Sequence, residues 1–374
     1  MKRTNPSRSA RGLVTTTGLA MSLVLGCGSH VQVPADAKLG MEYPSPDEEQ
    51  IARDGVQVAI ASIQQEHVAG QPTHRDAHIK AQGCVRGTFT VSSDLPPDMQ
   101  TGLFSHAGTY PVWIRYSNGL PKPQDDNQGN VHGMALKVMS VPGDKLSPDE
   151  HATQDFLLVN TPVFMVPGPA EYLEFSKAVV ADRPVSYFLG WNPFAWKIHD
   201  LLTLKHVLGQ AVPSVLAARY WSILPFRMGT QAVKWSAKPC SAVEAHMPSD
   251  PGPEYLREDL AARLGRGDAC FTFMAQRQQD PVKMPIEDAT VGWNETESPF
   301  VPLATVSIPS QTFTSPEQMT FCENLSFSPW HALPEHRPLG GLNRIRQLVY
   351  GEISKYRHDQ NQALRTEPTG TERF

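Results

Sequence analysis

Hydrophobic and polar positions divide the chain into a helical start, a strand-rich middle and a helical end. Ser45–Glu49 supplies a capping serine, a first-turn proline and two acids, which predicts a helix reaching about His67. From Gly83 to Asn160 apolar residues recur at every second position between turn-forming residues, which predicts consecutive antiparallel strands. Several such strands in sequence favour a barrel or a large curled sheet.

In the second half of the chain, the spacing of apolar residues changes from helical to strand-like and back to helical. Residues 168–220 are apolar with helical spacing, a second strand group is clearest at 270–277 and 301–308, and residues 341–358 again form a helix pattern. The pattern predicts an α+β fold in which an antiparallel barrel or curled sheet is preceded by an N-terminal helical arm at 45–73 and followed by helices at the C-terminal end. The polar tail, residues 361–374, is expected to fray.

The beginning of the chain has the order of an export signal. Four basic residues precede the apolar run Gly18–Gly26, which ends at Cys27. Because Val24–Cys27 resembles a bacterial lipobox, we expect residues 1–26 to be a lipoprotein signal peptide and Cys27 to carry the lipid. The mature protein, with a linker at 27–44, would then face the periplasm from a membrane. An ordinary signal peptide, and so a periplasmic protein, is the alternative.

Net charge, hydropathy and cysteine spacing exclude several classes of partner and metal site. A net charge of -5 leaves no broad basic surface for phosphate backbones, so no nucleic-acid partner is expected. No later stretch reaches the roughly 18 apolar residues of a membrane-spanning helix. Four further cysteines could pair in three ways, lack Cys-x-x-Cys spacing for zinc or iron–sulfur sites, and are most simply interpreted as buried thiols. They are Cys84, Cys240, Cys270 and Cys322.

The predicted final helix carries the most informative spacing. Arg346, Tyr350 and Arg357 lie at i, i+4 and i+11, so at about 100° per residue they share one stripe. Taken alone, this pattern also fits a solvated helix face with a half-buried tyrosine.

Six segments of the chain stand in the order and spacing of the catalase core. The chain therefore resembles the catalase superfamily over residues 74–358, and within it the short catalase-related peroxidases, which lack the C-terminal flavodoxin-like domain of large catalases. The resemblance implies a catalase-like haem domain at 74–360, in which a central antiparallel β-barrel is combined with C-terminal haem-binding helices. The segments are Arg75–His78, Trp113–Asn118, Gly133–Val138, Asp155–Phe164, Thr290–Trp293 and Arg346–Tyr350.

The resemblance assigns the residues that would hold the cofactor, a ferric b-type haem. Tyr350 would be the axial ligand of the iron, and Arg346 one turn earlier would donate to its phenolate oxygen. The guanidinium and the ferric charge both favour the phenolate form. Arg75, Arg115 and Arg357 would bind the propionates, since three guanidinium groups can orient and neutralise two carboxylates.

On the opposite side of the haem the resemblance places His78 as the distal histidine. Ser117, which shares a strand face with Arg115, resembles the serine that neighbours the third propionate arginine. A neutral imidazole can take a proton from a peroxide and return it to the departing oxygen, which makes cleavage of the O–O bond heterolytic. Phe164 and Tyr172 match the two distal aromatic positions.

One departure from the family pattern affects the expected activity. Catalases carry two asparagines before Thr-Pro, and here Val159 stands at the first, catalytic position, so only Asn160 remains as a doubtful catalytic candidate. Without the distal amide, dismutation of hydrogen peroxide should weaken. We therefore expect a haem peroxidase that reduces hydrogen peroxide or, preferentially, organic hydroperoxides, using an unknown reducing co-substrate, with weak or no catalase activity.

Three alternatives stay open. His74 and His78 have the i, i+4 spacing of a zinc helix, with His67 nearby, but no glutamate follows His74. A non-catalytic haem-binding lipoprotein would keep Tyr350 without turnover, and a haem enzyme could instead rearrange fatty-acid hydroperoxides. The sequence also leaves open the oligomeric state, where a homo-oligomer is one possibility.

Overall fold

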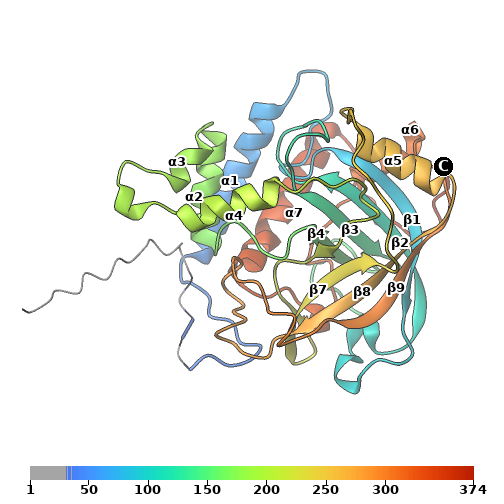
Figure 1. The fold of residues 1–374 in the computed structure, drawn as a ribbon, viewed down its shortest axis with the longest axis horizontal. Coiled ribbons are helices and arrows are strands. Elements are labelled where there is room, and N and C mark those ends of the chain that lie inside the picture. The colour runs from blue at the N-terminus through green and yellow to red at the C-terminus, as the bar shows by residue number, and fades with distance from the viewer. Residues whose placement is uncertain (1–30, 32, 35) are drawn as a thin grey trace, which may run out of the picture.

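The computed structural model describes residues 31, 33–34 and 36–374, so the expected signal peptide and Cys27 lie outside the described residues. Nine antiparallel strands form one sheet that closes on itself. The strands are β1 (Ala81–Val91), β2 (Gly108–Asn118), β3 (His132–Val138), β4 (Gln154–Val159), β5 (Tyr220–Trp221), β6 (Phe226–Met228), β7 (Gln231–Pro239), β8 (Ala269–Arg277) and β9 (Val301–Ile308). β5 pairs with both β4 and β7, which completes a ring of eight strands, and β6 adds to the edge of β7. The predicted antiparallel barrel is confirmed (Figure 1).

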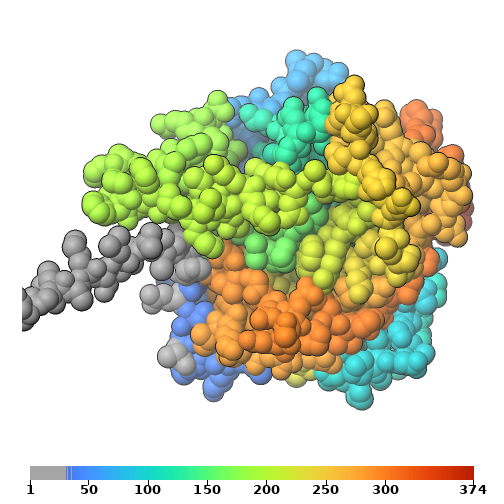
Figure 2. Space-filling model, in the orientation of Figure 1, coloured from blue at the N-terminus to red at the C-terminus, as the bar shows by residue number. Residues whose placement is uncertain are grey.

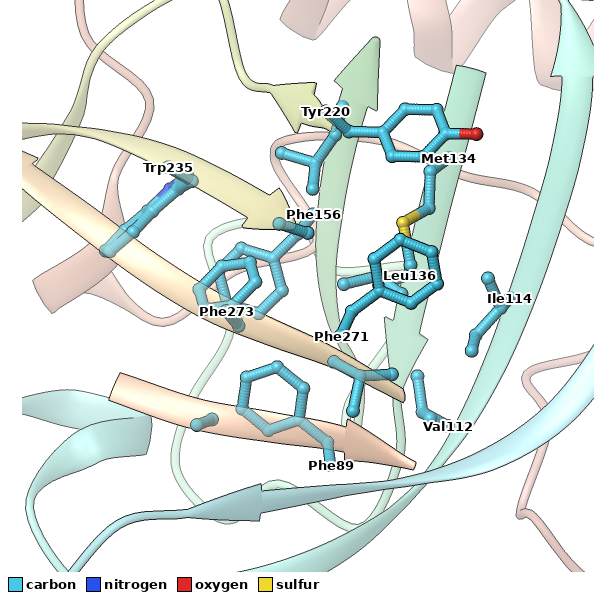
Figure 3. Packing of buried hydrophobic residues seen from close by; sticks show 14 of the residues in the cluster. Phe89, Val112, Ile114, Met134, Leu136, Phe156, Tyr220, Trp235, Phe271 and Phe273 are labelled. Atoms are coloured by element: carbon cyan, nitrogen blue, oxygen red, sulfur yellow. The ribbon is translucent and has the colours of Figure 1, made fainter. Parts of the chain in front are cut away.

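Aromatic side chains fill the inside of the barrel (Figure 3). The ring of Phe273 lies 4.6 Å from that of Phe156 and 5.3 Å from that of Phe89, measured between centroids. Trp235 and Phe104 close the same cluster at 5.8 Å from each other. Because the interior is occupied by packed side chains, a large ligand has to lie outside the barrel wall.

The outer wall of the barrel carries the polar residues of the same strands. Along β2, Ile114 and Tyr116 point into the barrel core, so Arg115 and Ser117 alternate to the outer face. On β4, Phe156 and Leu158 join the core, which places Val159 outside.

Helices cover this outer wall (Figure 1). The α-helices are α1 (Glu48–Glu66), α2 (Pro169–Val180), α3 (Pro184–Phe188), α4 (Ile198–Leu208), α5 (Tyr255–Leu264), α6 (Pro316–Asn324) and α7 (Gly341–Asn361), with 3₁₀ turns η1 (Pro97–Met99), η2 (Gly102–Phe104), η3 (Pro193–Ala195) and η4 (Pro334–His336). α1 packs on α7 through Val56 and Ile63 against Val349 and Ile353. The predicted first and last helices are confirmed, and no helix among the described residues is long and apolar enough to cross a bilayer.

Two disulfides correct the interpretation of the cysteines as buried thiols. Cys84 on β1 is bonded to Cys322 on α6, and Cys240 at the end of β7 is bonded to Cys270 on β8. Sequence separation gave no sign of the first pair, because its partners are 238 residues apart and meet only when α6 packs on the barrel. The bond fixes the end of α6 to β1 at Cys84. Cys84 is paired with Arg115 of the neighbouring strand β2.

Removing the disulfide that closes the larger loop should destabilise the protein more than removing the one that closes the smaller loop. The double variant Cys84→Ala with Cys322→Ala is expected to lower the free energy of unfolding by roughly 2–5 kcal/mol, because the crosslink restricts the unfolded chain. The matched variant Cys240→Ala with Cys270→Ala removes a disulfide that closes a loop of only 30 residues. Its free energy of unfolding should therefore fall by about 2 kcal/mol less. Denaturant titrations measure both, and equal losses would contradict the expectation.

The C-terminal tail is docked on the barrel, so the prediction that it frays is wrong. Arg365 donates to Glu150 at 2.8 Å, the backbone N–H of His151 donates to Glu367 at 2.9 Å, and Glu372 accepts from the indole of Trp113 at 3.1 Å. The polar composition that suggested fraying instead supplies acceptors for donors on the barrel surface.

Candidate functional site

Two neighbouring outward positions on the barrel wall, Ser117 and Gly133, adjoin the imidazole of His78. Ser117 on β2 pairs with Gly133 on β3, which pairs with Val159 on β4. The Nδ1 atom of His78 lies 3.0 Å from Ser117 Oγ. A Cβ added at Gly133 would come within 2.7 Å of the His78 ring, so glycine at this position leaves the room that the imidazole occupies.

The backbone holds His78 in an uncommon conformation. Its φ of 56° lies in the left-handed region that few residues other than glycine adopt, and its N–H donates to the carbonyl of Gly119 at 3.2 Å. Because Ser117 engages Nδ1, Nε2 is the ring nitrogen that can exchange a proton with a substrate. The local backbone strain is thus associated with the orientation of this side chain.

Burial is the largest cause that lowers the pKa of His78, to about 3, and the charges of Arg115, Arg346 and Arg75 add to it. The imidazole is therefore neutral at pH 7. Arg346 lies on α7, far from His78 in sequence, yet its charge is close enough to contribute to the lowered pKa of His78.

On α7 the predicted pair is formed. Arg346 Nη2 donates to the hydroxyl oxygen of Tyr350 at 2.8 Å, and the guanidinium carbon lies 4.7 Å from the centre of the tyrosine ring. Nη1 of Arg346 is oriented by the side-chain oxygen of Asn343 at 3.1 Å. A phenol oxygen that already accepts from a guanidinium is suited to act as a phenolate ligand.

The three predicted propionate arginines converge on Glu323 at the end of α6. Its carboxylate lies 3.6 Å from Arg75 Nε, 3.6 Å from Arg115 Nη2 and 3.9 Å from Arg357 Nη1. Burial opposes the ionisation of Glu323, but the three guanidinium charges outweigh it and lower the pKa of the carboxyl. Burial and then the charge of Arg75 lower the pKa of Arg115 and of Arg357 to about 9.

Backbone carbonyls of the same segment also accept from these arginines. Arg75 Nη2 donates to the carbonyls of Glu323 and Leu325, both at 2.9 Å, and Arg357 donates to the same two carbonyls. The arginines thus stabilise the C-terminal end of α6, where unpaired carbonyls and the helix dipole favour cations.

This arrangement fits a haem. Three buried guanidinium groups face one carboxylate, which leaves two positive charges for two propionates. The Nε atoms of Arg75 and Arg115 and the Oε1 atom of Glu323 are buried without a hydrogen-bond partner among the described residues. Together with a guanidinium-bound phenol on α7 and a neutral imidazole on the barrel wall, the donor set matches what such a ligand requires.

The two predicted distal aromatic residues and Val159 adjoin one apolar cluster. Phe164 and Tyr172 lie with their ring centres 6.0 Å apart, and both, like Val159, pack against a cluster that includes Ile345 of α7. Burial, followed by Asp76 and Tyr350, raises the pKa of Tyr172, so its hydroxyl is neutral. This side of the site is hydrophobic rather than lined by amides.

Asn160 is engaged in the sheet. Its side-chain oxygen accepts from the backbone N–H of His132 at 2.8 Å, and its own N–H donates to the His132 carbonyl at 3.0 Å. The residue thereby extends the β3–β4 pairing by one step. Its part in a distal pocket stays a prediction.

Three features of the site were not anticipated from the sequence. Glu323 lacks a local signal, because its role depends on three arginines from other elements. Gly133 was visible only as the start of a strand segment. Asp76 lies between Arg75 and His78, and its pKa is raised by burial; its position within the Arg75–His78 segment was the one available hint.

The histidines considered for zinc do not form a metal group. Among the described residues, one set of three acidic or histidine side chains brings its ligand atoms within 4.8 Å, namely Glu150, Asp155 and His331. The Nζ atom of Lys137 lies in it, 2.5 Å from Glu150 and 2.8 Å from Asp155. A lysine ammonium thus already supplies the cation at that place.

A similar sequence is found among known proteins. No family model matches the chain. A catalase-related peroxidase from Mycolicibacterium paratuberculosis is 28% identical over 318 residues, which cover 80% of this chain and 93% of the relative.

Solved catalases share the fold at low sequence identity. A fungal catalase has a TM-score of 0.63 at 16% identity, covering 92% of this chain and 70% of its own. Catalase A from Saccharomyces cerevisiae has a TM-score of 0.62 at 16% identity, covering 92% and 72%. A bacterial catalase has a TM-score of 0.59 at 15% identity, covering 98% and 70%.

Proposed function

We propose that this chain is a haem-dependent peroxidase of the catalase superfamily that prefers organic hydroperoxides and has weak or no catalase activity, since it is similar to a catalase-related peroxidase in sequence and to catalases in fold. Tyr350 would ligate the iron of a b-type haem, with Arg346 on its phenolate oxygen. Arg75, Arg115 and Arg357 would hold the propionates. A ferric haem, when bound, supplies the redox-active iron at which the peroxide O–O bond is cleaved.

The proton chemistry belongs to His78. Its neutral imidazole can accept a proton at Nε2 from the hydroperoxide and donate it to the departing oxygen, while Ser117 fixes the ring through Nδ1. The net reaction takes two electrons and two protons from a reducing co-substrate and converts the hydroperoxide to an alcohol and water.

The observation that carries the preference for organic hydroperoxides is Val159 on the barrel wall, paired with Gly133, which in turn adjoins the ring of His78. With Phe164 and Tyr172 it offers apolar contacts to an alkyl group. It offers no hydrogen bond to orient a second hydrogen peroxide. Dismutation needs such orientation more than alkyl hydroperoxide reduction does.

Restoring the amide should shift this preference. Val159→Asn is expected to raise the ratio of oxygen release from hydrogen peroxide to dye oxidation by an alkyl hydroperoxide by about tenfold, because one oriented donor enters the pocket. Val159→Leu is the matched control, since it keeps an apolar side chain, and its ratio should stay near that of the wild type. A ratio that Val159→Asn leaves unchanged would contradict the proposed basis of the preference.

An absorption spectrum followed by three parallel assays tests the function itself. Purified protein should show the Soret band of a tyrosinate-ligated haem. It should oxidise a dye donor faster with an alkyl hydroperoxide than with hydrogen peroxide. Conversion of a lipid hydroperoxide without any donor would favour the rearranging enzyme, and haem without turnover would favour a carrier.

The location of the protein is part of the proposal. The basic leader, the apolar run and Cys27 support an exported lipoprotein held at a membrane on its periplasmic side. Metabolic labelling with a radioactive fatty acid, with Cys27→Ser as the comparison, would detect the lipid directly. Homo-oligomer formation is left to sizing experiments.

A further inference from the structure

Exposed apolar side chains concentrate on one lobe of the molecule, formed by α2, α3, η3 and α4. Of the fourteen large hydrophobic residues that are exposed in the described chain, six lie within residues 185–202. They are Val185, Trp191, Phe194, Trp196, Ile198 and Leu202. Figure 2 shows this lobe, in light green, standing out from the body of the protein. Exposed apolar patches of this kind usually mark an interaction surface.

The lobe has a packed interior of its own, so the exposure is built into its structure. Phe188 is buried, and its ring lies 5.8 Å from Phe175 of α2 and 4.9 Å from Tyr187. The ammonium of Lys197 lies 3.6 Å from the centre of the Tyr187 ring. α3 is thereby fixed on α2, and the turn that follows has a rigid base.

That turn presents two aromatic rings to solvent. The indole N–H of Trp196 donates to the carbonyl of Gly190 at 2.8 Å, and the side-chain oxygen of Asn192 accepts from the backbone N–H of Phe194 at 3.1 Å. These bonds close the turn and pair polar groups within it. Trp191 is 97% exposed and Phe194 is 96% exposed.

The first described residue, Val31, lies next to the start of the lobe. A Cβ at Gly168, the residue before α2, would lie 3.1 Å from the side chain of Val31, whose N–H donates to Asp288 at 3.2 Å. Four residue steps separate Val31 from Cys27, and an extended chain spans about 14 Å over that distance. A lipid on Cys27 would therefore hold this side of the protein close to a bilayer, and the lobe extends from the same side (Figure 1).

We propose that the lobe rests on the surface of a lipid bilayer, with Trp191 and Phe194 inserted at the level of the headgroups. Ile198 and Leu202, one turn apart on α4, would lie against the acyl boundary beside them. Tryptophan is enriched at this depth because its ring is apolar and its N–H is polar.

The segment of the lobe that follows α2 carries a small excess of basic residues. Residues 181–210 hold three basic side chains, Arg183, Lys197 and Lys205, against two acidic ones, of which Asp200 is buried, whereas α2 itself adds Glu171, Glu174 and Lys177. The whole chain in contrast carries a net charge of -5. Lysine and arginine next to apolar interfacial residues add electrostatic attraction to the apolar contribution.

A vesicle-binding experiment tests the lobe apart from the lipid. The full exported chain carrying Cys27→Ser is mixed with vesicles of phosphatidylethanolamine and phosphatidylglycerol, and the bound fraction is measured by flotation. Adding Trp191→Ser and Phe194→Ser should lower the partition coefficient by about tenfold or more, since two apolar rings lose their burial. Leu364→Ser is the matched control, because Leu364 is 90% exposed but lies beyond α7, and it should bind as before.

Fluorescence gives a second measurement. Vesicles should shift the tryptophan emission to shorter wavelength, and Trp191→Phe should remove that shift. Absence of vesicle binding by the Cys27→Ser chain, or equal binding after both serine substitutions, would overturn the proposal. So would a concentration-dependent dimer that the two serines abolish without any vesicle binding, because the patch would then be an interface between copies. The inference rests on the proposed lipid anchor only for the side of approach, and binding is measured whether or not haem is present.

Discussion

Tyr350→Phe is expected to leave the purified protein with little or no haem. The substitution removes the oxygen that accepts from Arg346 at 2.8 Å and keeps the ring and its packing against α1. Because a phenyl group cannot ligate iron, haem per protein should fall by about tenfold or more. The ratio of Soret to protein absorbance, after growth with added hemin, measures the effect.

The same helix offers a control for this experiment. Tyr356 also lies on α7, and its hydroxyl oxygen accepts from Gln64 at 3.2 Å on the protein surface. Tyr356→Phe should keep the haem content of the wild type. If Tyr350→Phe retained full haem with an unchanged spectrum, another residue would be the ligand and the assignment of the site would be wrong.

His78→Ala should separate binding from turnover. The variant keeps Tyr350, Arg346 and the arginines around Glu323, so haem content should stay near that of the wild type. Turnover with an alkyl hydroperoxide should fall by roughly 10²–10⁴-fold, because the group that moves the proton is lost. Single-turnover kinetics with stopped-flow absorbance would show whether the loss lies in the step with peroxide.

The pH profile adds an independent check on His78. A pKa of about 3 keeps its imidazole neutral, so protonation of this group should depress the step with peroxide only as the pH falls toward 3. His74→Ala, on the exposed part of the same loop, is the control and should retain turnover. Full activity of His78→Ala would refute the assigned role, and a loss of activity centred near pH 6.5 would show that the imidazole is not buried as described.

Much of the fold could be predicted from local patterns. Alternation along residues 112–117 predicts that Ile114 and Tyr116 face one side and Arg115 and Ser117 the other, and this is what β2 shows. The i, i+4 spacing of Arg346 and Tyr350 likewise predicts their contact. Such relations follow from the repeat of the strand and of the helix, which depends on neighbouring residues only.

The candidate site could be predicted only in part. His78, Tyr350 and the three arginines were found through the order of short segments. The structure brings the three arginines together at Glu323 and pairs Tyr350 with Arg346, whose charge contributes to the lowered pKa of His78. The contact of His78 with Ser117 and Gly133 was not predictable, because it depends on the register of β2 with β3 and on the left-handed backbone of His78.

What the sequence by itself determined are the helix stripes, the strand faces and the valine at 159. Only the tertiary structure decided that Glu323 meets three arginines, that Cys84 pairs with Cys322, that the tail docks on the barrel, and that Trp191 and Phe194 are exposed. The physical reason is the same in each case. Periodicity is set by the geometry of adjacent peptide units, whereas these contacts and exposures depend on how segments distant in sequence pack around a closed barrel.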